Sequence, residues 1–198
     1  MIQRQLARQA LTMAEQFPVV TIVGPRQAGK TTLARMTFTG HTYVNLEDPE
    51  ARALASNDPN AFIARYSGPS IFDEIQRVPE LLSSIQVEVD RDPLMGRYIL
   101  TGSHQTALQQ AISQSLAGRS ALLQLLPFSL EELGSEAPKS LDELLIKGFL
   151  PRIYHADQDP NPAYRSYFQT YVERDLRQLI AVKNLALFQK FMRLCAGR

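Results

Sequence analysis

Short apolar runs alternate with longer amphipathic stretches along the first two thirds of the chain. The apolar runs are rich in β-branched and aromatic residues, and they predict strands at residues 18–23, 42–46, 70–73, 97–101 and 121–126. Between them, apolar residues recur at helical spacing, which predicts helices at residues 2–16, 31–36, 49–56, 60–66, after Pro79 and at 105–111. Strands that alternate with helices indicate an α/β fold, with a parallel five-stranded sheet flanked by helices.

After Pro127 the pattern becomes purely helical, as in a small helical C-terminal segment. Two Ser-x-x-Glu pairs have the spacing of capping boxes and predict short helices: Ser129 with Glu132, and Ser140 with Glu143. A polar, proline-broken linker at 157–162 precedes a stretch with apolar residues at helical spacing from Tyr164 onwards. We therefore expect three segments: a core at 1–127, short helices that cap it at 128–156, and the start of a helical domain at 157–198.

Composition narrows the class of protein. The 198 residues suit one α/β domain with a small appendage, and 44% of them are hydrophobic, as in an ordinary globular core. The chain has 21 Lys and Arg residues against 20 Asp and Glu residues. This balance predicts neither a basic stripe that would bind nucleic acid nor a basic patch that would bind an anionic membrane. A single cysteine, Cys195, excludes an intramolecular disulfide. No apolar run approaches the ~20 residues of a membrane span, so we expect a soluble, cytoplasmic protein.

The first candidate site is the sequence GPRQAGKT at residues 24–31, between a predicted strand and a predicted helix. It has the G-x-x-x-x-G-K-[ST] spacing of a phosphate-binding loop, and this context favours phosphate binding over a plain strand-to-helix turn. The glycines let backbone N–H groups face an anion, and the helix dipole adds positive potential. Lys30 would reach the terminal phosphates, and Thr31 would bind Mg²⁺. The expected nucleotide-binding residues are Gly24, Pro25, Arg26, Gln27, Ala28, Gly29, Lys30, Thr31 and Thr32.

The second candidate is Asp73-Glu74, at the carboxyl end of the strand expected at 70–73. Ligands of open α/β sheets bind at this edge. We expect Asp73 to hold the Mg²⁺ shell and Glu74 to polarise an attacking water molecule. Two adjacent carboxylates are also common on ordinary surfaces, so the position at a strand end carries this prediction.

Further polar and basic residues are candidates for contact with the reacting phosphate. Ser103, or as second choice Thr101, ends a strand and would act as a sensor of that phosphate, although Ser103 would equally suit a helix N-cap. Arg119 follows a helix-ending glycine and could stabilise charge on a transferred phosphoryl group, in its own site or in a neighbour's. It could equally be a solvated arginine that complements a helix dipole. Arg26 is a similar candidate for phosphate or partner contact.

With these residues assembled, the chain resembles a family of prokaryotic AAA+-type ATPases whose module is joined to a C-terminal domain of unknown function. Nearly the whole chain matches in the family's order, through GPRQAGKTTL, YVNLEDPEARALASNDP, IFDEIQRVPELL, YILTGS, LAGRSALLQLLPFSLEEL and YVERDL. The resemblance implies binding and hydrolysis of ATP, and the choice of ATP over GTP rests on it. It assigns Lys30, Thr31, Asp73 and Glu74 the roles above, and it favours Ser103 as sensor and Arg119 as an arginine finger.

Family members continue past the YVERDL helix into winged-helix-like and nuclease-like regions. The resemblance therefore implies an ATPase module with a truncated C-terminal part, whose Mg²⁺-dependent hydrolysis of ATP drives conformational change in an attached or partner domain. It also implies a homo-oligomer or a protein partner, and nucleic acid enters only by family analogy. Two other functions stay open: a small-molecule or nucleotide kinase, and a nucleotide-gated binding switch with negligible turnover.

Overall fold

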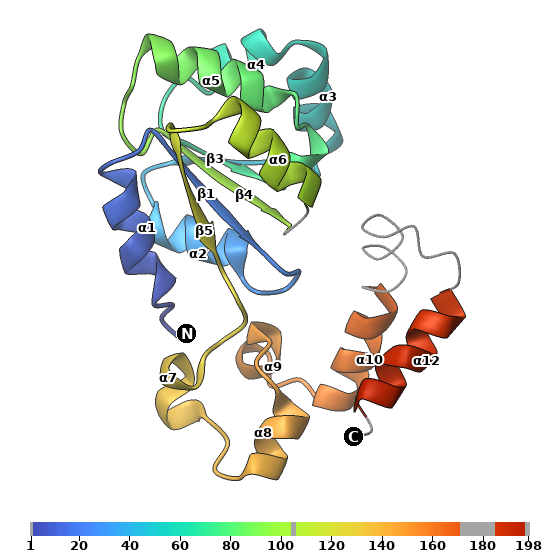
Figure 1. The fold of residues 1–198 in the computed structure, drawn as a ribbon. Coiled ribbons are helices and arrows are strands. Elements are labelled where there is room, and N and C mark those ends of the chain that lie inside the picture. Colours follow the sequence, from blue (N-terminus) through green and yellow to red (C-terminus); the bar gives the residue numbers. More distant parts are fainter. Residues whose placement is uncertain (1, 104–105, 171–184, 197–198) are drawn as a thin grey trace. The chain divides into compact units, whose positions relative to one another are not determined.

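The computed structural model describes residues 2–103, 106–170 and 185–196 (Figure 1). Their contacts divide the chain into two compact units. The first comprises Met1–Ala137 with Phe149–Pro151, and the second comprises Pro138–Gly148 with Arg152–Arg198. The three segments expected from the sequence stay a prediction, because compactness alone does not define a domain.

The first unit is built on a five-stranded sheet with the strand order β2-β3-β4-β1-β5. Every neighbouring pair of strands is parallel, as a sheet fed by alternating helices requires. The strands are β1 (Val19–Gly24), β2 (Thr42–Asn45), β3 (Ser70–Asp73), β4 (Tyr98–Ser103) and β5 (Ser120–Gln124). All residues of β1 and β4 are buried, which explains why both strands are mostly apolar. The predicted α/β fold with a parallel five-stranded sheet is confirmed.

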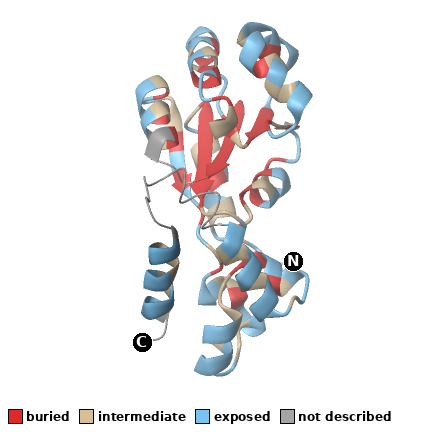
Figure 2. Cartoon of the chain, turned by 90° about the vertical axis from the view of Figure 1, so that its right-hand side faces the viewer, coloured by how far each residue is buried: buried red, intermediate tan, exposed pale blue. Residues whose placement is uncertain are grey.

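Helices cover both faces of this sheet (Figure 1). One face packs against α1 (Leu6–Ala14) and α2 (Lys30–Thr37). The other packs against α3 (Pro49–Asn57), α4 (Pro59–Arg65), α5 (Leu81–Arg91) and α6 (Thr106–Ser115). The buried residues of the unit concentrate in the sheet, while the outer sides of the helices are exposed (Figure 2).

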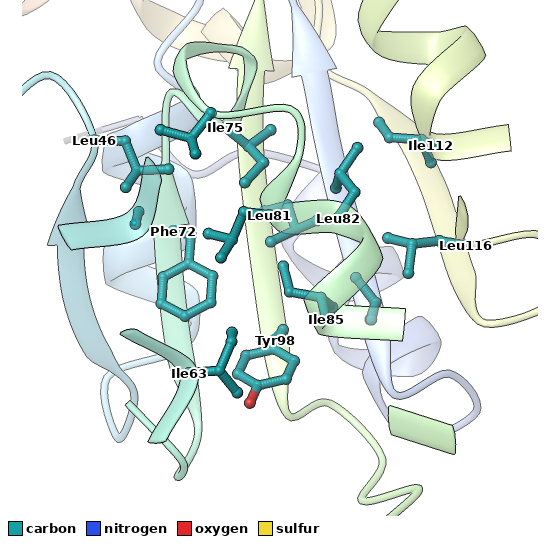
Figure 3. Close-up of a cluster of buried hydrophobic side chains, with 14 of the residues drawn as sticks. Leu46, Ile63, Phe72, Ile75, Leu81, Leu82, Ile85, Tyr98, Ile112 and Leu116 are labelled. Carbon is teal, nitrogen blue, oxygen red and sulfur yellow. The ribbon is translucent and has the colours of Figure 1, made fainter. Parts of the chain in front are cut away.

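Two apolar cores result from the alternation of side chains along each strand. In β1, Val20 and Ile22 belong to the core beneath α1 and α2, whereas Val19 and Val23 belong to the opposite core. In the larger core the rings of Phe72 and Tyr98 stack on each other, and Leu81, Leu82 and Ile85 of α5 belong to the same cluster (Figure 3). These two cores hold the strands rigidly, so the polar groups at their ends keep defined positions.

Two helices begin later than the sequence pattern predicts. The first begins at Leu6 and not at residue 2, because the N–H of Gln5 and the side chain of Arg4 bond to the Glu132 carboxylate. The helix expected to have Pro79 in its first turn begins at Leu81. The preceding residues form the short 3₁₀ helix η1 (Ile75–Arg77) and further i+3 backbone hydrogen bonds, which replace an α-helical turn.

Both predicted capping sites begin helices. Before α7 (Leu130–Leu133), the Ser129 hydroxyl accepts the N–H of Glu132, whose carboxylate accepts the N–H of Ser129, each at 3.0 Å. The 3₁₀ helix η2 (Gly134–Glu136) follows α7. Before α8 (Leu141–Lys147), the Ser140 hydroxyl accepts the N–H of Glu143 at 3.2 Å.

The second unit contains helices in the parts that the structure describes. After α8 come α9 (Pro151–His155, whose first residue belongs to the first unit), α10 (Pro160–Thr170) and α12 (Leu185–Ala196). Tyr164 on α10 donates its hydroxyl to the carbonyl of Lys147 at 3.0 Å, which joins α10 to the end of α8. The YVERDL helix that the sequence predicts lies outside the described residues. Among the residues that the structure describes, there is no candidate for a membrane-spanning helix.

Candidate functional site

The predicted phosphate loop joins β1 to α2, and its two glycines are needed for different reasons. Gly29 has a φ of 91°, in the left-handed region that favours glycine, and Gln27 has a φ of 61°. A Cβ on Gly24 would lie 2.0 Å from the carbonyl oxygen of Leu125, so only glycine permits this close approach. The loop therefore combines a left-handed turn with tight packing against the chain after β5.

Lys30 is the first residue of α2, and its side chain folds back over the loop. Its ammonium donates to the carbonyls of Gly24 at 3.1 Å and Pro25 at 2.9 Å, and the residue is buried. Gly29, the N-cap, supplies no side-chain acceptor for the first N–H groups of the helix. Backbone donors, a helix N-terminus and an ammonium group thus gather in the loop, a combination that suits a phosphate group.

Asp73 ends β3 and is 4% exposed. Thr31 donates its hydroxyl to both carboxylate oxygens at 2.9 and 3.0 Å, Tyr43 donates at 2.8 Å, and Thr101 donates as well. No basic side chain among the described residues pairs with this carboxylate. A buried carboxylate that meets only hydroxyl groups is suited to a cation.

The residues present fit Mg²⁺. Because the hydrogen of the Thr31 hydroxyl points to Asp73, the lone pairs of its oxygen remain for a metal ion. In the described part of the chain, no three His, Cys, Asp or Glu side chains gather as a metal cage. Mg²⁺ needs no such cage, because it typically takes one or two protein ligands and completes its shell with water and phosphate oxygens.

Glu74 lies directly after Asp73, at the same edge of the sheet. Its φ of 60° is unusual for a residue with a side chain, and it starts the tight turn into η1. Gln76, two residues later, donates its amide N–H to the Glu74 carboxylate. The structure thus brings both predicted carboxylates to the end of the sheet that carries the phosphate loop.

Ser103 is the last residue of β4 and pairs with Gly24 of β1 in the sheet register. It is 6% exposed, and its hydroxyl has no hydrogen-bond partner among the described residues. The hydroxyl of Thr101, the second choice of the sequence analysis, instead donates to Asp73. Ser103 therefore has the hydroxyl that is free to bind a ligand beside the loop.

Arg119 lies at the other end of the sheet. Its carbonyl accepts the N–H of Val19, the first residue of β1, whereas the phosphate loop follows the last residue of that strand. Its guanidinium binds both carboxylate oxygens of Asp90 on α5, at 2.5 and 2.8 Å, and this contact lowers the pKa of Asp90. The structure does not bring Arg119 to Lys30 of the same chain, and a role in a neighbouring subunit stays a prediction.

Three residues that were not predicted from the sequence contact the site. Tyr43 on β2 donates to Asp73, and burial together with this hydrogen bond raises the pKa of its hydroxyl, which therefore stays a donor. Gln76 contacts Glu74. Arg4 donates to the loop carbonyl of Ala28 at 2.7 Å and to Glu132 at 3.0 Å. Tyr43 and Arg4 are far in sequence from their partners, so no local sequence pattern could have predicted these contacts.

Comparisons with known proteins agree with this architecture. Residues 16–134 match a family described as an AAA domain, and residues 138–198 match a family described as a domain of unknown function. The chain is 37% identical over 185 residues to the uncharacterised proteins Rv2008c of Mycobacterium tuberculosis and Mb2031c of Mycobacterium bovis. These matches cover 90% of this chain but only 41% of each relative, so the chain spans about two fifths of their length.

Among solved structures, the Walker-type ATPase PABY2304 of Pyrococcus abyssi aligns with a TM-score of 0.53 at 15% identity. The alignment covers 90% of this chain and 75% of that one, which shows a shared fold. The expected winged-helix-like and nuclease-like regions stay a prediction. The AAA-domain match spans more than half of the chain and includes the loop, Asp73, Glu74 and Ser103, so the chain belongs to the AAA domain family.

Proposed function

We propose that this chain binds ATP together with Mg²⁺ and hydrolyses the ATP to ADP and phosphate. One observation carries the proposal: the buried Asp73 carboxylate meets only hydroxyl groups, beside a loop that holds Lys30 and a strand end that presents the Ser103 hydroxyl. Membership of the AAA domain family and the Walker-type ATPase fold support it.

Binding would use the phosphate loop and the Thr31–Asp73 pair. Lys30 and the loop N–H groups would neutralise the phosphate oxygens, while Thr31 and Asp73 would hold Mg²⁺ directly or through water. When bound, Mg²⁺ supplies positive charge that stabilises the charge developing on the phosphates. Arg4, through its hydrogen bond to Ala28, would hold the loop against the segment after β5.

Hydrolysis would use Glu74 as the base. Its carboxylate would accept a proton from water while the water oxygen bonds to the terminal phosphorus. The bond from phosphorus to the bridging oxygen breaks, and its electron pair leaves with ADP. The Ser103 hydroxyl would donate a hydrogen bond to the transferred group, which removes the cost of an unpartnered buried hydroxyl.

The role of this activity in the complete protein is also a proposal. We propose that hydrolysis drives a conformational change in an attached or partner domain, with ATP-dependent contacts between copies of the chain. The length of the mycobacterial relatives supports an attached domain, because the chain spans only 41% of them. Contact with nucleic acid rests on family analogy alone.

Two variants test the proposal. Lys30→Ala should remove most of the thermal stabilisation by MgATP, which reaches roughly 2.7 kcal/mol at a hundredfold the dissociation constant. Glu74→Gln should still bind ATP but release phosphate at least ~10²-fold more slowly, the range of a positioned base. Lys139→Ala, at an exposed lysine, is the matched control and should behave as wild type.

The outcome also separates the alternatives. Release of inorganic phosphate by wild type, lost in Glu74→Gln, supports hydrolysis. Transfer of the terminal phosphate to an added hydroxyl or nucleotide acceptor, with no inorganic phosphate, would identify a kinase. Stabilisation by MgATP without either product would identify a nucleotide-gated switch. A wild-type melting temperature that ignores millimolar MgATP would exclude nucleotide binding.

A further inference from the structure

The side chain of Gln76 bridges the ends of two strands at the candidate site. Its amide nitrogen donates to the carboxylate of Glu74, which directly follows β3. Its amide oxygen accepts the backbone N–H of Ser103, at the end of β4, at 3.3 Å. Both the donor and the acceptor of this amide therefore have partners. The donor contacts the side chain of Glu74, the candidate base, and the acceptor contacts the backbone of Ser103, the candidate sensor.

The backbone around Gln76 is shaped to permit this bridge. The left-handed φ of Glu74 starts the 3₁₀ turn of η1, which returns the chain so that position 76 lies beside the strand ends. A Cβ on Gly102 would lie 2.7 Å from the amide oxygen of Gln76 and 2.6 Å from Cδ2 of Leu108. Gly102, the residue before Ser103, thus leaves the space that the glutamine occupies.

The alternative is that Gln76 merely satisfies the N–H of Ser103. That role would need only the amide oxygen, which a carboxylate would supply equally well. It would not require the amide nitrogen to contact Glu74. The donor side of the amide points to a second role, because an N–H donor restricts the orientations of a carboxylate.

We propose that Gln76 is a positioning residue that orients the Glu74 carboxylate and is itself anchored on the N–H of Ser103. This inference rests on the proposed hydrolysis of a nucleoside triphosphate. A base must lie within hydrogen-bonding reach of the water whose proton it accepts. A carboxylate on a flexible side chain spends less time in that position when its donor is lost. Gln76 would therefore affect the rate of the chemical step and leave nucleotide affinity unchanged.

Two substitutions separate the two ends of the amide. Gln76→Met keeps the length of the side chain and removes both hydrogen bonds. Gln76→Glu keeps an oxygen for the N–H of Ser103 but replaces the donor with a second carboxylate, which repels Glu74. Gln86→Met, the same change at a half-buried glutamine on α5, is the matched control. Melting temperature and the dissociation constant for MgATP show that each variant is folded and binds.

We expect both Gln76 variants to lower kcat about tenfold or more, with the dissociation constant for MgATP within twofold of wild type. In a Glu74→Gln background, Gln76→Met should cause no further loss, because a positioning residue has no effect once its base is gone. Wild-type kcat in both Gln76 variants, or an equal further loss in the Glu74→Gln background, would overturn the inference. A wild type that binds MgATP without hydrolysing it would overturn the proposed function as well, so the two failures are distinguishable.

Discussion

The two ends of the sheet both bury charged side chains, but they treat them differently. At the amino end of β4, the Arg97 guanidinium is 5% exposed and lies 2.6 Å from the Glu88 carboxylate, which is 9% exposed. Arg97 also donates to the carbonyl of Ser67 at 2.6 and 3.0 Å and contacts Asp92 at 3.3 Å. In this amino-end cluster of Arg97, Glu88 and Asp92, each charge is paired with an opposite charge, so the cluster needs no ligand to neutralise it.

The carboxyl end gathers polar groups without that neutralisation. Asp73 receives hydrogen bonds from Thr31, Tyr43 and Thr101, which stabilise a carboxylate but leave its charge in place. The Ser103 hydroxyl is buried with no partner in the described part of the chain. Burial of charge therefore does not distinguish a functional site from a structural one. What distinguishes them is whether the charge is cancelled by the chain's own residues.

Loss of Arg97 should reduce stability more than any other substitution considered at either end of the sheet. Arg97→Met would leave Glu88 buried without its main partner, which should lower the free energy of unfolding by about 3–5 kcal/mol. Urea unfolding followed by circular dichroism measures this loss. ATP affinity of the molecules that remain folded should not change, since the cluster lies at the other end of the sheet.

Arg91→Met is the matched control for Arg97. Arg91 also contacts the Glu88 carboxylate, at 2.6 Å, but its side chain is 75% exposed. Its removal should cost less than about 1 kcal/mol, as for exposed ion pairs. Equal losses for the two arginines would show that burial does not set the strength of the amino-end cluster.

Loss of the Ser103 hydroxyl, at the carboxyl end of the sheet, should lower turnover without lowering the free energy of unfolding. Ser103→Ala removes a buried hydroxyl that has no partner, so the free energy of unfolding should stay constant or rise. Turnover should fall by about 10²–10³-fold, because a hydrogen-bond donor to the reacting phosphate is lost. Ser83→Ala, at an exposed position on α5, should change neither quantity. A destabilised Ser103→Ala protein with full turnover would contradict a sensor role.

A third, smaller effect tests whether hydroxyl donors hold Asp73. Tyr43→Phe removes one of its three donors and should lower the free energy of unfolding by about 1–2 kcal/mol, measured in the presence of a chelator of divalent cations. Tyr66, whose ring packs against Phe62 and Phe72, makes no side-chain hydrogen bond to a carboxylate among the described residues, so Tyr66→Phe should cost less. Equal losses in the two variants would mean that the contact between Tyr43 and Asp73 contributes nothing specific.

The same substitution should change the response to alkaline pH. Burial, followed by the hydrogen bond to Asp73, raises the pKa of Tyr43 above its ordinary value of 10.0. The unfolded chain therefore loses this proton at a lower pH than the folded protein does. The stability linked to Tyr43 is complete below pH 10 and declines as the pH rises above it. Tyr43→Phe should show a shallower decline above pH 10 in urea unfolding at stepped pH.

Loss of Arg119 should have little consequence for an isolated chain. Arg119→Ala removes an exposed ion pair with Asp90 and should leave stability nearly unchanged. Turnover of dilute chains should also stay constant, because Arg119 lies at the end of the sheet opposite to Lys30.

A role of Arg119 in a neighbouring subunit would appear only on assembly. Turnover per subunit should then rise with protein concentration, and mixing Arg119→Ala with Glu74→Gln should restore part of the activity. A constant rate across the dilution series, with no recovery on mixing, would leave Arg119 as a partner of Asp90 only.

Features that depend on neighbouring residues could be predicted from the amino-acid pattern alone. The alternation of apolar runs and helical spacing indicated the α/β fold, and the spacing from Gly24 to Thr31 indicated the phosphate loop. The capping box of Ser129 and Glu132 formed as its spacing predicts. Each of these depends on backbone geometry over a few residues, where a local pattern is sufficient.

Contacts between side chains that are distant in sequence follow from the arrangement of the strands in the folded chain. The strand order places β4 between β1 and β3, which sets Ser103 beside Gly24 and Thr101 beside Asp73. The same order brings Tyr43 from β2 to Asp73, while Arg119 ends at the far edge of the sheet. No periodicity within a strand encodes its neighbours, because strand order follows from the packing of helices on both faces and from the buried cores they share.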